Sequence, residues 1–443
     1  MQLVNIMMIP KSKLLGLVLI ALPLISFSQE NSPYSRYGIG NLVPAGNILN
    51  RGMGGISAAF ADPATVNFIN PASYSRLIYT TLDVGAEVDS RTLISLDPQG
   101  KFTANNAIIS YLQLGIPLLN ANKKAARKNI SLGMNFGLRP ISKINYKISK
   151  FGRISNIDSL LTIFEGSGGI NEAFAGTGIK IKNLSFGINV GYLFGNKDYS
   201  TRLIFINDTV QYASSNSATK TNFGGLSING GVQYATKIKG GIFKAGAYGN
   251  LQQKYNATQD VLRETFSFNA NSDEVEKLDS VYEKLDQKGK IELPASFGIG
   301  FTVEKIHWLL GADFEVANWD NYRFYGQKDL VKSNWIVKAG VQYFPATTGS
   351  VKYWNFVRYR AGFFFGPDYI TADNNLPQYG VSVGAGFPLK LKRSFYETQY
   401  SVLNMGVEYG SRGNKNNNVR ENILRISVGF TLSDIWFRRY KYD

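Results

Sequence analysis

Charged residues stand at every second position in several segments where apolar residues fill the positions between them. Asp313 and Glu315 form one such pair, Arg358 and Arg360 form another, and Arg425 lies in a third segment. In an extended strand, residues two apart point to the same face. The arginine side chains could therefore bind an anionic headgroup or a carboxylate through their forked donors. The alternative, which we favour, is a set of internal salt bridges, because buried charges are costly unless paired.

The chain offers few residues for catalysis or metal binding. It contains no cysteine, which excludes disulfides, thiolate nucleophiles and a lipidated cysteine, and its one histidine is His307. Zinc sites usually draw on several His or Cys ligands. A Ser–His hydrolase would have to use His307, which we expect to be a solvated residue beside a tight periplasmic turn. The run Gly52-Met53-Gly54-Gly55 lacks the flanking strand, helix and lysine of a phosphate-binding loop. We therefore expect no enzyme activity, no cofactor and no metal.

The segments that carry the charges alternate apolar and polar residues with a period of two. In the last of them every second residue from Leu424 to Leu432 is apolar, and the residues between are polar or glycine. Such alternation predicts a strand with one lipid-facing side, long enough to cross a bilayer when tilted. We therefore predict an all-β fold, a transmembrane antiparallel β-barrel of about fourteen strands within residues 78–443. The fourteen segments lie near 79–88, 107–117, 129–139, 171–180, 183–194, 225–234, 241–253, 295–304, 307–318, 334–343, 356–365, 379–388, 401–410 and 423–432.

The connections between these segments alternate in length. An even number of strands places both chain ends on the periplasmic side, so 181–182, 235–240 and 305–306 are predicted to be short periplasmic turns. The connections 140–170, 195–224 and 254–294 are then long external loops. In the longest loop, apolar residues at helical spacing predict a short amphipathic helix over the barrel mouth. These residues are Val275, Leu278, Val281, Tyr282 and Leu285.

Aromatic residues fall at the ends of the predicted strands on the apolar face, as expected of girdles at the two headgroup layers. A large soluble β-sandwich also alternates, but it would not account for the girdles, the loop asymmetry and an export signal together. The girdle residues are Tyr234, Trp308, Tyr343 and Phe387 at one rim and Tyr192, Trp335, Tyr379 and Tyr409 at the other.

The first 28 residues have the pattern of a secretory signal peptide. Lys11 and Lys13 precede an apolar run over residues 14–25, and small residues follow. The run is short for a spanning helix, so a retained anchor is the less favoured alternative. We expect cleavage after Ser28 and a final location in the outer membrane of a Gram-negative cell. The net charge of +16 is spread along the chain without a nucleic-acid motif. It favours anionic lipid headgroups, and not nucleic acid, as the partner.

Residues 29–77 do not alternate and are rich in small residues. They contain the glycines Gly52, Gly54 and Gly55, then Asp62, and then Asn70-Pro71-Ala72. Irregular backbone is tolerated at membrane depth only inside protein. We therefore predict that residues 29–77 form a plug inside the lumen. The alternative for Asn70-Pro71 is a simple turn that leads into the first strand.

The stretch from Gly52 through Asp62 to Ala72 resembles the hatch of the FadL-type outer-membrane transporters. This family includes long-chain fatty acid and aromatic-hydrocarbon channels and the PorV-type barrels of secretion machines. The resemblance implies a fourteen-stranded barrel around an N-terminal hatch whose Asn-Pro-Ala signature falls on Asn70, Pro71 and Ala72. It implies a gating role for these residues and for Gly52, Gly54, Gly55 and Asp62. It also implies passive uptake, in which the hatch shifts and a small hydrophobic ligand leaves sideways through the wall.

A second function is compatible with the same resemblance. The chain could be a non-transporting barrel that serves as a subunit or partner of an outer-membrane secretion or assembly complex. A continuous apolar tunnel beside an unpaired wall strand would favour transport. A salt-bridged lumen, including Arg358, Arg360, Arg425, Asp313 and Glu315, together with large external docking surfaces, would favour the partner role.

Overall fold

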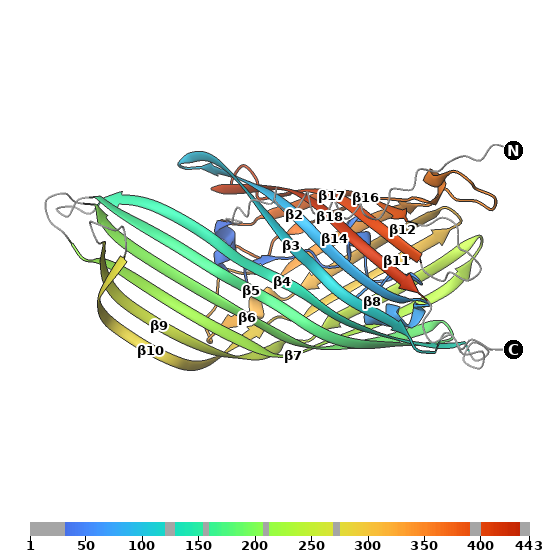
Figure 1. Ribbon diagram of the computed structural model, residues 1–443, viewed down its shortest axis with the longest axis horizontal. Helices are drawn as coiled ribbons and strands as arrows, with labels where there is room; N and C mark the ends of the chain where they lie inside the picture. Colours follow the sequence, from blue (N-terminus) through green and yellow to red (C-terminus); the bar gives the residue numbers. More distant parts are fainter. Residues whose placement is uncertain are drawn as a thin grey trace, which may run out of the picture.

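The computed structural model describes residues 32–119, 129–153, 159–206, 212–268, 275–389 and 400–434. The predicted signal peptide, residues 1–28, lies outside this part of the chain. The described residues form one antiparallel sheet that closes on itself as a barrel (Figure 1). Among them, no helix is both long and apolar enough to cross a membrane.

Fourteen strands make up the wall, as the alternation predicted. β9 and β10 continue β8 and β11 above short breaks, and β1 and β13 are two-residue strands. The ladder between β18 and β2 closes the ring. The strands are β1 (Asn41–Leu42), β2 (Thr80–Leu96), β3 (Gln99–Pro117), β4 (Ile130–Arg153), β5 (Ser159–Ile181), β6 (Leu184–Ile206), β7 (Ser214–Ile238), β8 (Gly241–Asn250), β9 (Gln253–Phe268), β10 (Val275–Leu293), β11 (Ser296–Lys305), β12 (Trp308–Ala317), β13 (Arg323–Phe324), β14 (Asn334–Tyr343), β15 (Arg358–Pro367), β16 (Pro377–Pro388), β17 (Tyr400–Arg412) and β18 (Val419–Asp434).

The two faces of the wall differ as the period-two pattern predicts. On β18, Leu424 and Ile426 are 44% and 48% exposed, whereas Arg425 and Ser427 between them are each 5% exposed. Apolar side chains therefore face outward and polar side chains face the lumen. Six of the predicted girdle aromatics are at least 40% exposed on the outer face: Tyr192, Tyr234, Trp308, Trp335, Tyr379 and Tyr409. This distribution is that of a barrel in a bilayer.

The predicted external loops are largely strand. β4 and β5 extend their ladder to Arg153 and Ser159, and β6 and β7 extend theirs to Leu203 and Ser215. The extended hairpins and the β9–β10 pair form a tall wall on one side of the barrel, drawn green to yellow in Figure 1. The sequence pattern missed this because the polar–apolar contrast weakens above the membrane, where both faces of a strand meet water.

The predicted amphipathic helix was wrong, because residues 275–293 form β10. The ladder between β9 and β10 shifts register between Lys277 and Asp279, between Ser280 and Tyr282, and between Lys284 and Gln287. A bulge inserts an unpaired residue into one strand. Leu278, Val281 and Leu285 are such inserted residues and are 53–69% exposed. Bulges three or four residues apart thus produce the apolar spacing that resembles a helix.

Residues 32–77, which we call the N-terminal segment, lie inside the ring of strands. Its regular pieces are η2 (Pro33–Arg36), β1, α2 (Ile48–Arg51) and η3 (Pro71–Arg76). Wall glycines meet it from opposite sides of the barrel. A Cβ placed on Gly187 of β6 would lie 2.2 Å from Pro71, and one on Gly340 of β14 would lie 2.2 Å from the Met53 carbonyl oxygen. These glycines therefore provide the room that the segment occupies.

The wall is least continuous between β3 and β4. Their ladder runs only from Leu112–Leu138 to Pro117–Gly133, although both strands continue toward the external side. Above this ladder the N-terminal segment takes over the edge of β4. Leu42 pairs with Ser142 in the β1–β4 ladder, and the Val43 N–H donates to the Ile141 carbonyl oxygen at 2.9 Å. The segment thus satisfies backbone groups that β3 leaves unpaired.

Because the segment lies so close to the wall, replacing a wall glycine by alanine should lower the stability of the barrel only where the new methyl group meets the segment. Gly340→Ala and Gly362→Ala place a Cβ 2.2 Å from segment backbone atoms and should destabilise the folded barrel by about 1–3 kcal/mol. Gly406→Ala is the matched control in β17, because its Cβ would meet no atom closer than 3.7 Å. Thermal unfolding in detergent, followed by circular dichroism, measures the difference. Equal unfolding temperatures for all three variants would contradict the packing described.

Candidate functional site

The candidate site is the contact between the N-terminal segment and the lumen wall, where the predicted hatch residues meet Arg358 and Asp313 of the wall. Asn70 is fully buried and begins η3 as its N-cap, with its Oδ1 accepting from the Ala72 N–H at 3.1 Å. Its Nδ2 donates to the Ala58 carbonyl oxygen at 2.6 Å and faces the carbonyl oxygens of Val232 on β7 and Ala247 on β8 at 3.3 and 3.2 Å. Pro71 occupies the first helical position, where the absence of an N–H costs nothing. The Asn-Pro-Ala sequence therefore joins two parts of the segment to the wall, which a simple turn would not do.

The glycine run lies against β15 and β16. Gly54 has φ +68°, and a Cβ there would lie 2.6 Å from the Phe363 carbonyl oxygen. Its N–H donates to the Ser382 hydroxyl at 3.0 Å. Gly52 lies beside Gly384, with a Cβ distance of 3.4 Å to the Gly384 Cα, and Gly55 has φ +85°. Gly54 is thus required both by its backbone conformation and by its closeness to the wall.

Asp62 pairs with Arg358 at the periplasmic end of the lumen. The Arg358 Nη1 lies 2.9 Å from the Asp62 Oδ2, and the Ala64 N–H donates to Oδ1 at 2.9 Å. Burial alone would raise the pKa of the Asp62 carboxyl, but the Arg358 guanidinium and the Ala64 N–H outweigh it and hold the pKa below its ordinary value. Asp62 is therefore a charged anchor that ties the segment to β15.

Asp313 holds the segment through its backbone. Its Oδ2 accepts from the Ser57 N–H at 2.5 Å and from the Ala58 N–H at 2.8 Å. Glu315, the next inward residue of β12, pairs with Lys338 of β14 at 2.5 Å. One acid of the predicted pair thus binds the segment, and the other binds the neighbouring strand.

The predicted arginines do not form one cluster. Arg360 donates to the side-chain oxygens of Gln342 and Asn404, each at 2.9 Å, and has no carboxylate partner within the described residues. Arg425 contacts Glu408 and lies 2.5 Å from Asp89. Arg425 also lies 3.7 Å from Glu87, which pairs with Arg51 of the segment. Apart from Arg360, the predicted lumen charges are therefore distributed over separate groups of charges around the segment.

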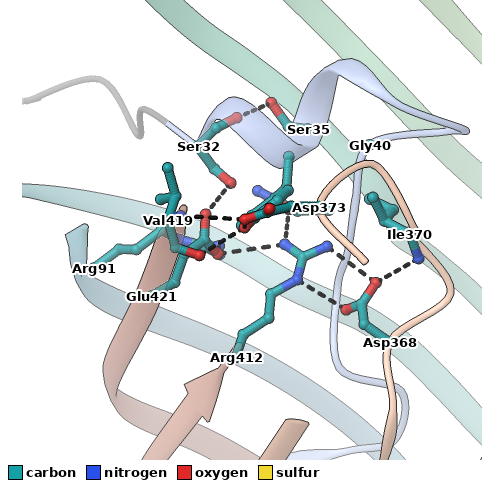
Figure 2. A network of polar contacts seen from close by, with 12 residues as sticks. Ser32, Ser35, Gly40, Arg91, Asp368, Ile370, Asp373, Arg412, Val419 and Glu421 are labelled. Atoms are coloured by element: carbon teal, nitrogen blue, oxygen red, sulfur yellow. Dashed lines mark hydrogen bonds and ion pairs between the residues drawn. The ribbon is translucent and has the colours of Figure 1, made fainter. Parts of the chain in front are cut away.

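A further network of charges at the external end was not found from the sequence (Figure 2). The Arg412 guanidinium lies between Asp368, at 2.9 Å, and Glu421, at 3.3 Å. Glu421 is fully buried, also pairs with Arg91 at 2.6 Å, and accepts from the Ser32 hydroxyl at 2.5 Å. Arg91, Arg412 and Glu421 lie two or three residues beyond the predicted strand ends, where the parity analysis stopped. Extending the alternation by three residues would have placed all three in the lumen.

Cavities remain above and below the segment. Two, of about 230 and 280 Å³, lie on the external side and share lining from residues 42–45. A third, of about 630 Å³, opens at the periplasmic mouth, and it shares no lining residue with the other two. The external cavities are lined by charged residues such as Arg51 and Arg425 as well as by apolar ones such as Ile336 and Phe364. Among the described residues, no group of three or more acids or histidines is placed to hold a metal ion.

Comparisons with known proteins agree with this architecture. A family model described as BamG matches residues 8–443. The Pseudomonas putida toluene transporter TodX superposes with a TM-score of 0.56 at 15% identity, covering 89% of this chain and 100% of that one. The Ralstonia pickettii toluene transporter TbuX gives 0.51 at 13% identity, with 88% and 99% covered. The CymD monoaromatic hydrocarbon channel gives 0.50 at 14% identity, with 90% and 98% covered. At these identities the likeness is one of fold. No curated protein matches the sequence significantly.

The buried external network predicts a large cost for removing one of its charges. Arg412→Met should destabilise the barrel by about 3–5 kcal/mol, because the carboxylates of Asp368 and Glu421 lose a buried partner. Arg202→Met is the control, because its pair with Glu165 is more than a third exposed on the arginine side and should contribute about 1 kcal/mol or less. Denaturant unfolding in detergent compares the two variants. A similar loss of unfolding free energy in both variants would show that the buried network does not stabilise the external end of the barrel more than an exposed ion pair does.

Proposed function

The chain belongs to the BamG family, and from this premise and the closed lumen we propose that it is a non-transporting barrel that serves as a subunit or partner in an outer-membrane secretion or assembly complex. In this proposal residues 1–28 direct export, residues 29–77 are a permanent plug, and residues 78–443 are the membrane barrel. The channel fold is kept as a scaffold, since function lies in the site and not in the fold.

The observation that carries this proposal is the ionic attachment of the segment to the wall. Arg51 binds Glu87, Asp62 binds Arg358, and the Ser57 and Ala58 N–H groups bind Asp313. Breaking a buried ion pair costs about 3–5 kcal/mol. A seven-carbon hydrocarbon gains only about 6 kcal/mol on full burial, at about 0.8 kcal/mol per carbon. Entry of such a molecule would offset the loss of one or two ion pairs, whereas release of the segment would break both ion pairs and also the hydrogen bonds to Asp313.

Surfaces for a partner are present outside the membrane. The tall wall of β4–β7, β9 and β10 rises above the rest of the barrel (Figure 1). Phe151, Val281 and Leu285 on this wall are 72%, 69% and 60% exposed. Exposed apolar side chains on an aqueous surface are typical of protein interaction sites. The net charge of +16 further supports contact with anionic lipid headgroups around the barrel.

A second candidate function, uptake of small hydrophobic molecules, is favoured by one specific feature. The β3–β4 ladder ends at Leu112 and Leu138, and Ser110 and Pro140 just above that point line the 280 Å³ external cavity. A fatty-acid-like ligand could leave the cavity sideways at this place if the segment released the edge of β4. The fold that the chain shares with hydrocarbon channels supports the same candidate.

The partner role predicts a stable complex. Affinity purification of the full chain from outer membranes in mild detergent should recover at least one other membrane or periplasmic protein in fixed proportion. Mass spectrometry of proteins and lipids in the same sample measures this. Recovery of the chain alone, with bound fatty acids or hydrocarbons, would contradict the proposal and support the channel.

A disulfide between segment and wall separates the two functions directly. Leu42 and Ser142 are paired across the β1–β4 ladder, and the Ser142 hydroxyl makes no hydrogen bond within the described residues. Because the chain has no native cysteine, two introduced cysteines can pair only with each other. Oxidised Leu42→Cys/Ser142→Cys should keep its partner proteins and its function in cells, because the segment need not move. Loss of hydrocarbon uptake on oxidation, restored by reduction, would instead show that the segment is a gate. Each single-cysteine variant is the control.

A further inference from the structure

The periplasmic mouth contains a cavity whose cations are only partly neutralised. This vestibule, the cavity of about 630 Å³ described above, lies between the floor of the N-terminal segment and the ends of β4, β5, β8, β11, β12, β14 and β15. Two of its cations are paired. Lys244 lies 3.1 Å from Glu304, and Arg358 lies 2.9 Å from Asp62.

Arg76 and Lys180 are different, because neither forms an ion pair within 4.0 Å of an acid among the described residues. The Arg76 Nε and Nη2 atoms are buried and form no hydrogen bond within the described part of the chain. Lys180 is an inward residue of β5 in the same lining, and no ion pair or hydrogen bond is found for its ammonium among the described residues. Burial lowers the pKa of the Arg76 guanidinium and outweighs the opposing effect of the more distant Glu304 carboxylate, which already pairs with Lys244.

Most other lumen arginines differ from Arg76, and Arg360, which also lacks a carboxylate among the described residues, still donates to Gln342 and Asn404. Arg51, Arg91, Arg139, Arg412 and Arg425 all face carboxylates at 3.3 Å or less. Buried guanidinium N–H groups without an acceptor, such as those of the Arg76 Nε and Nη2 atoms, forfeit the hydrogen bonds that they would make in water. The fold tolerates this cost at the one end of the lumen that is open to the periplasm, where an incoming carboxylate could supply both the charge and the acceptors.

We propose that the vestibule binds an acidic, extended peptide segment of a periplasmic protein, with a carboxylate received by Arg76 and Lys180. This inference rests on the proposed partner role for the identity of its occupant. The forked donors of Arg76 fit a carboxylate in two-point contact. Apolar lining from Phe60 and Leu309 would cover the carbon atoms of neighbouring side chains.

The position of the vestibule favours a peptide over a lipid. Arg76 belongs to the segment inside the ring, and the strand ends surround it, so a phospholipid would have to leave the bilayer to reach it. The volume of about 630 Å³ is much larger than a single inorganic anion and fits a few amino-acid residues. A peptide of a periplasmic protein reaches this mouth directly.

Calorimetric titration of the full chain in detergent tests the proposal with tetraglutamate as the probe and tetraglutamine as the uncharged match. We expect tetraglutamate to bind and tetraglutamine not to bind. Arg76→Gln should weaken tetraglutamate binding roughly tenfold to a hundredfold, the effect of losing a hydrogen bond between charged groups. Lys180→Gln should also weaken it. Lys239→Gln, an exposed lysine on the β7–β8 turn outside the cavity lining, should leave it unchanged.

Three results would overturn the inference: equal binding of both peptides, binding unaffected by both variants, or binding of inorganic phosphate as tight as that of tetraglutamate, which would indicate an adventitious ion only. Competition by phosphatidylglycerol micelles, without competition by peptide, would assign the vestibule to lipid and also overturn it. Co-purification separates this inference from the proposed function. If wild-type protein recovers no partner, the partner role fails. If partners are recovered equally by wild type and by Arg76→Gln/Lys180→Gln, and tetraglutamate does not bind, only the vestibule assignment fails.

Discussion

Charges enclosed by a ring of strands have little water to stabilise them, and the interior of this barrel is arranged around that constraint. Arg425 and Arg412 each meet more than one acid, and two of those acids, Glu87 and Glu421, also meet Arg51 and Arg91. The N-terminal segment takes part in this pairing through Arg51 and Asp62, and its backbone satisfies Asp313. Segment and wall are therefore parts of one electrostatic unit, and removing either would leave unpaired charge in the other.

The same constraint distinguishes this molecule from a simple pore of the same fold. The wall resembles that of hydrocarbon channels over most of its length. The lumen, however, is not an apolar passage. Arg51, Arg425 and Glu408 line an external cavity together with Phe364. The local separation of β3 and β4 remains compatible with sideways exit, but the segment already occupies the edge of β4 there. The balance of these features favours a scaffold that keeps its plug.

Much of the fold follows from the sequence because a single rule, alternation with period two, controls every membrane strand. The rule placed β14 at Asn334–Tyr343 and placed Arg425 and Asp313 in the lumen. The rule failed where a strand no longer has lipid on one face and the lumen on the other. Above the membrane both faces of a strand meet water, so the tall hairpins looked like loops, and bulges in β10 gave Leu278, Val281 and Leu285 the spacing of a helix. The alternation also shows only which side chains point into the lumen, and not which of them form pairs there. The pairing of Arg412 with Asp368, from the connection between β15 and β16, depends on distances across the barrel that no local pattern contains.

The route of the N-terminal segment has a consequence for how the protein is made. Ser32 hydrogen-bonds to Glu421 at the external end, whereas Leu77 leads into β2 at the periplasmic end, so the segment runs the full depth of the barrel. Glu421 belongs to β18, the strand whose pairing with β2 shuts the ring. The start of the N-terminal segment is therefore bound by the same strand that completes the barrel. We expect the segment to take its place in the lumen before or while β18 pairs with β2, because its far end contacts the closing strand.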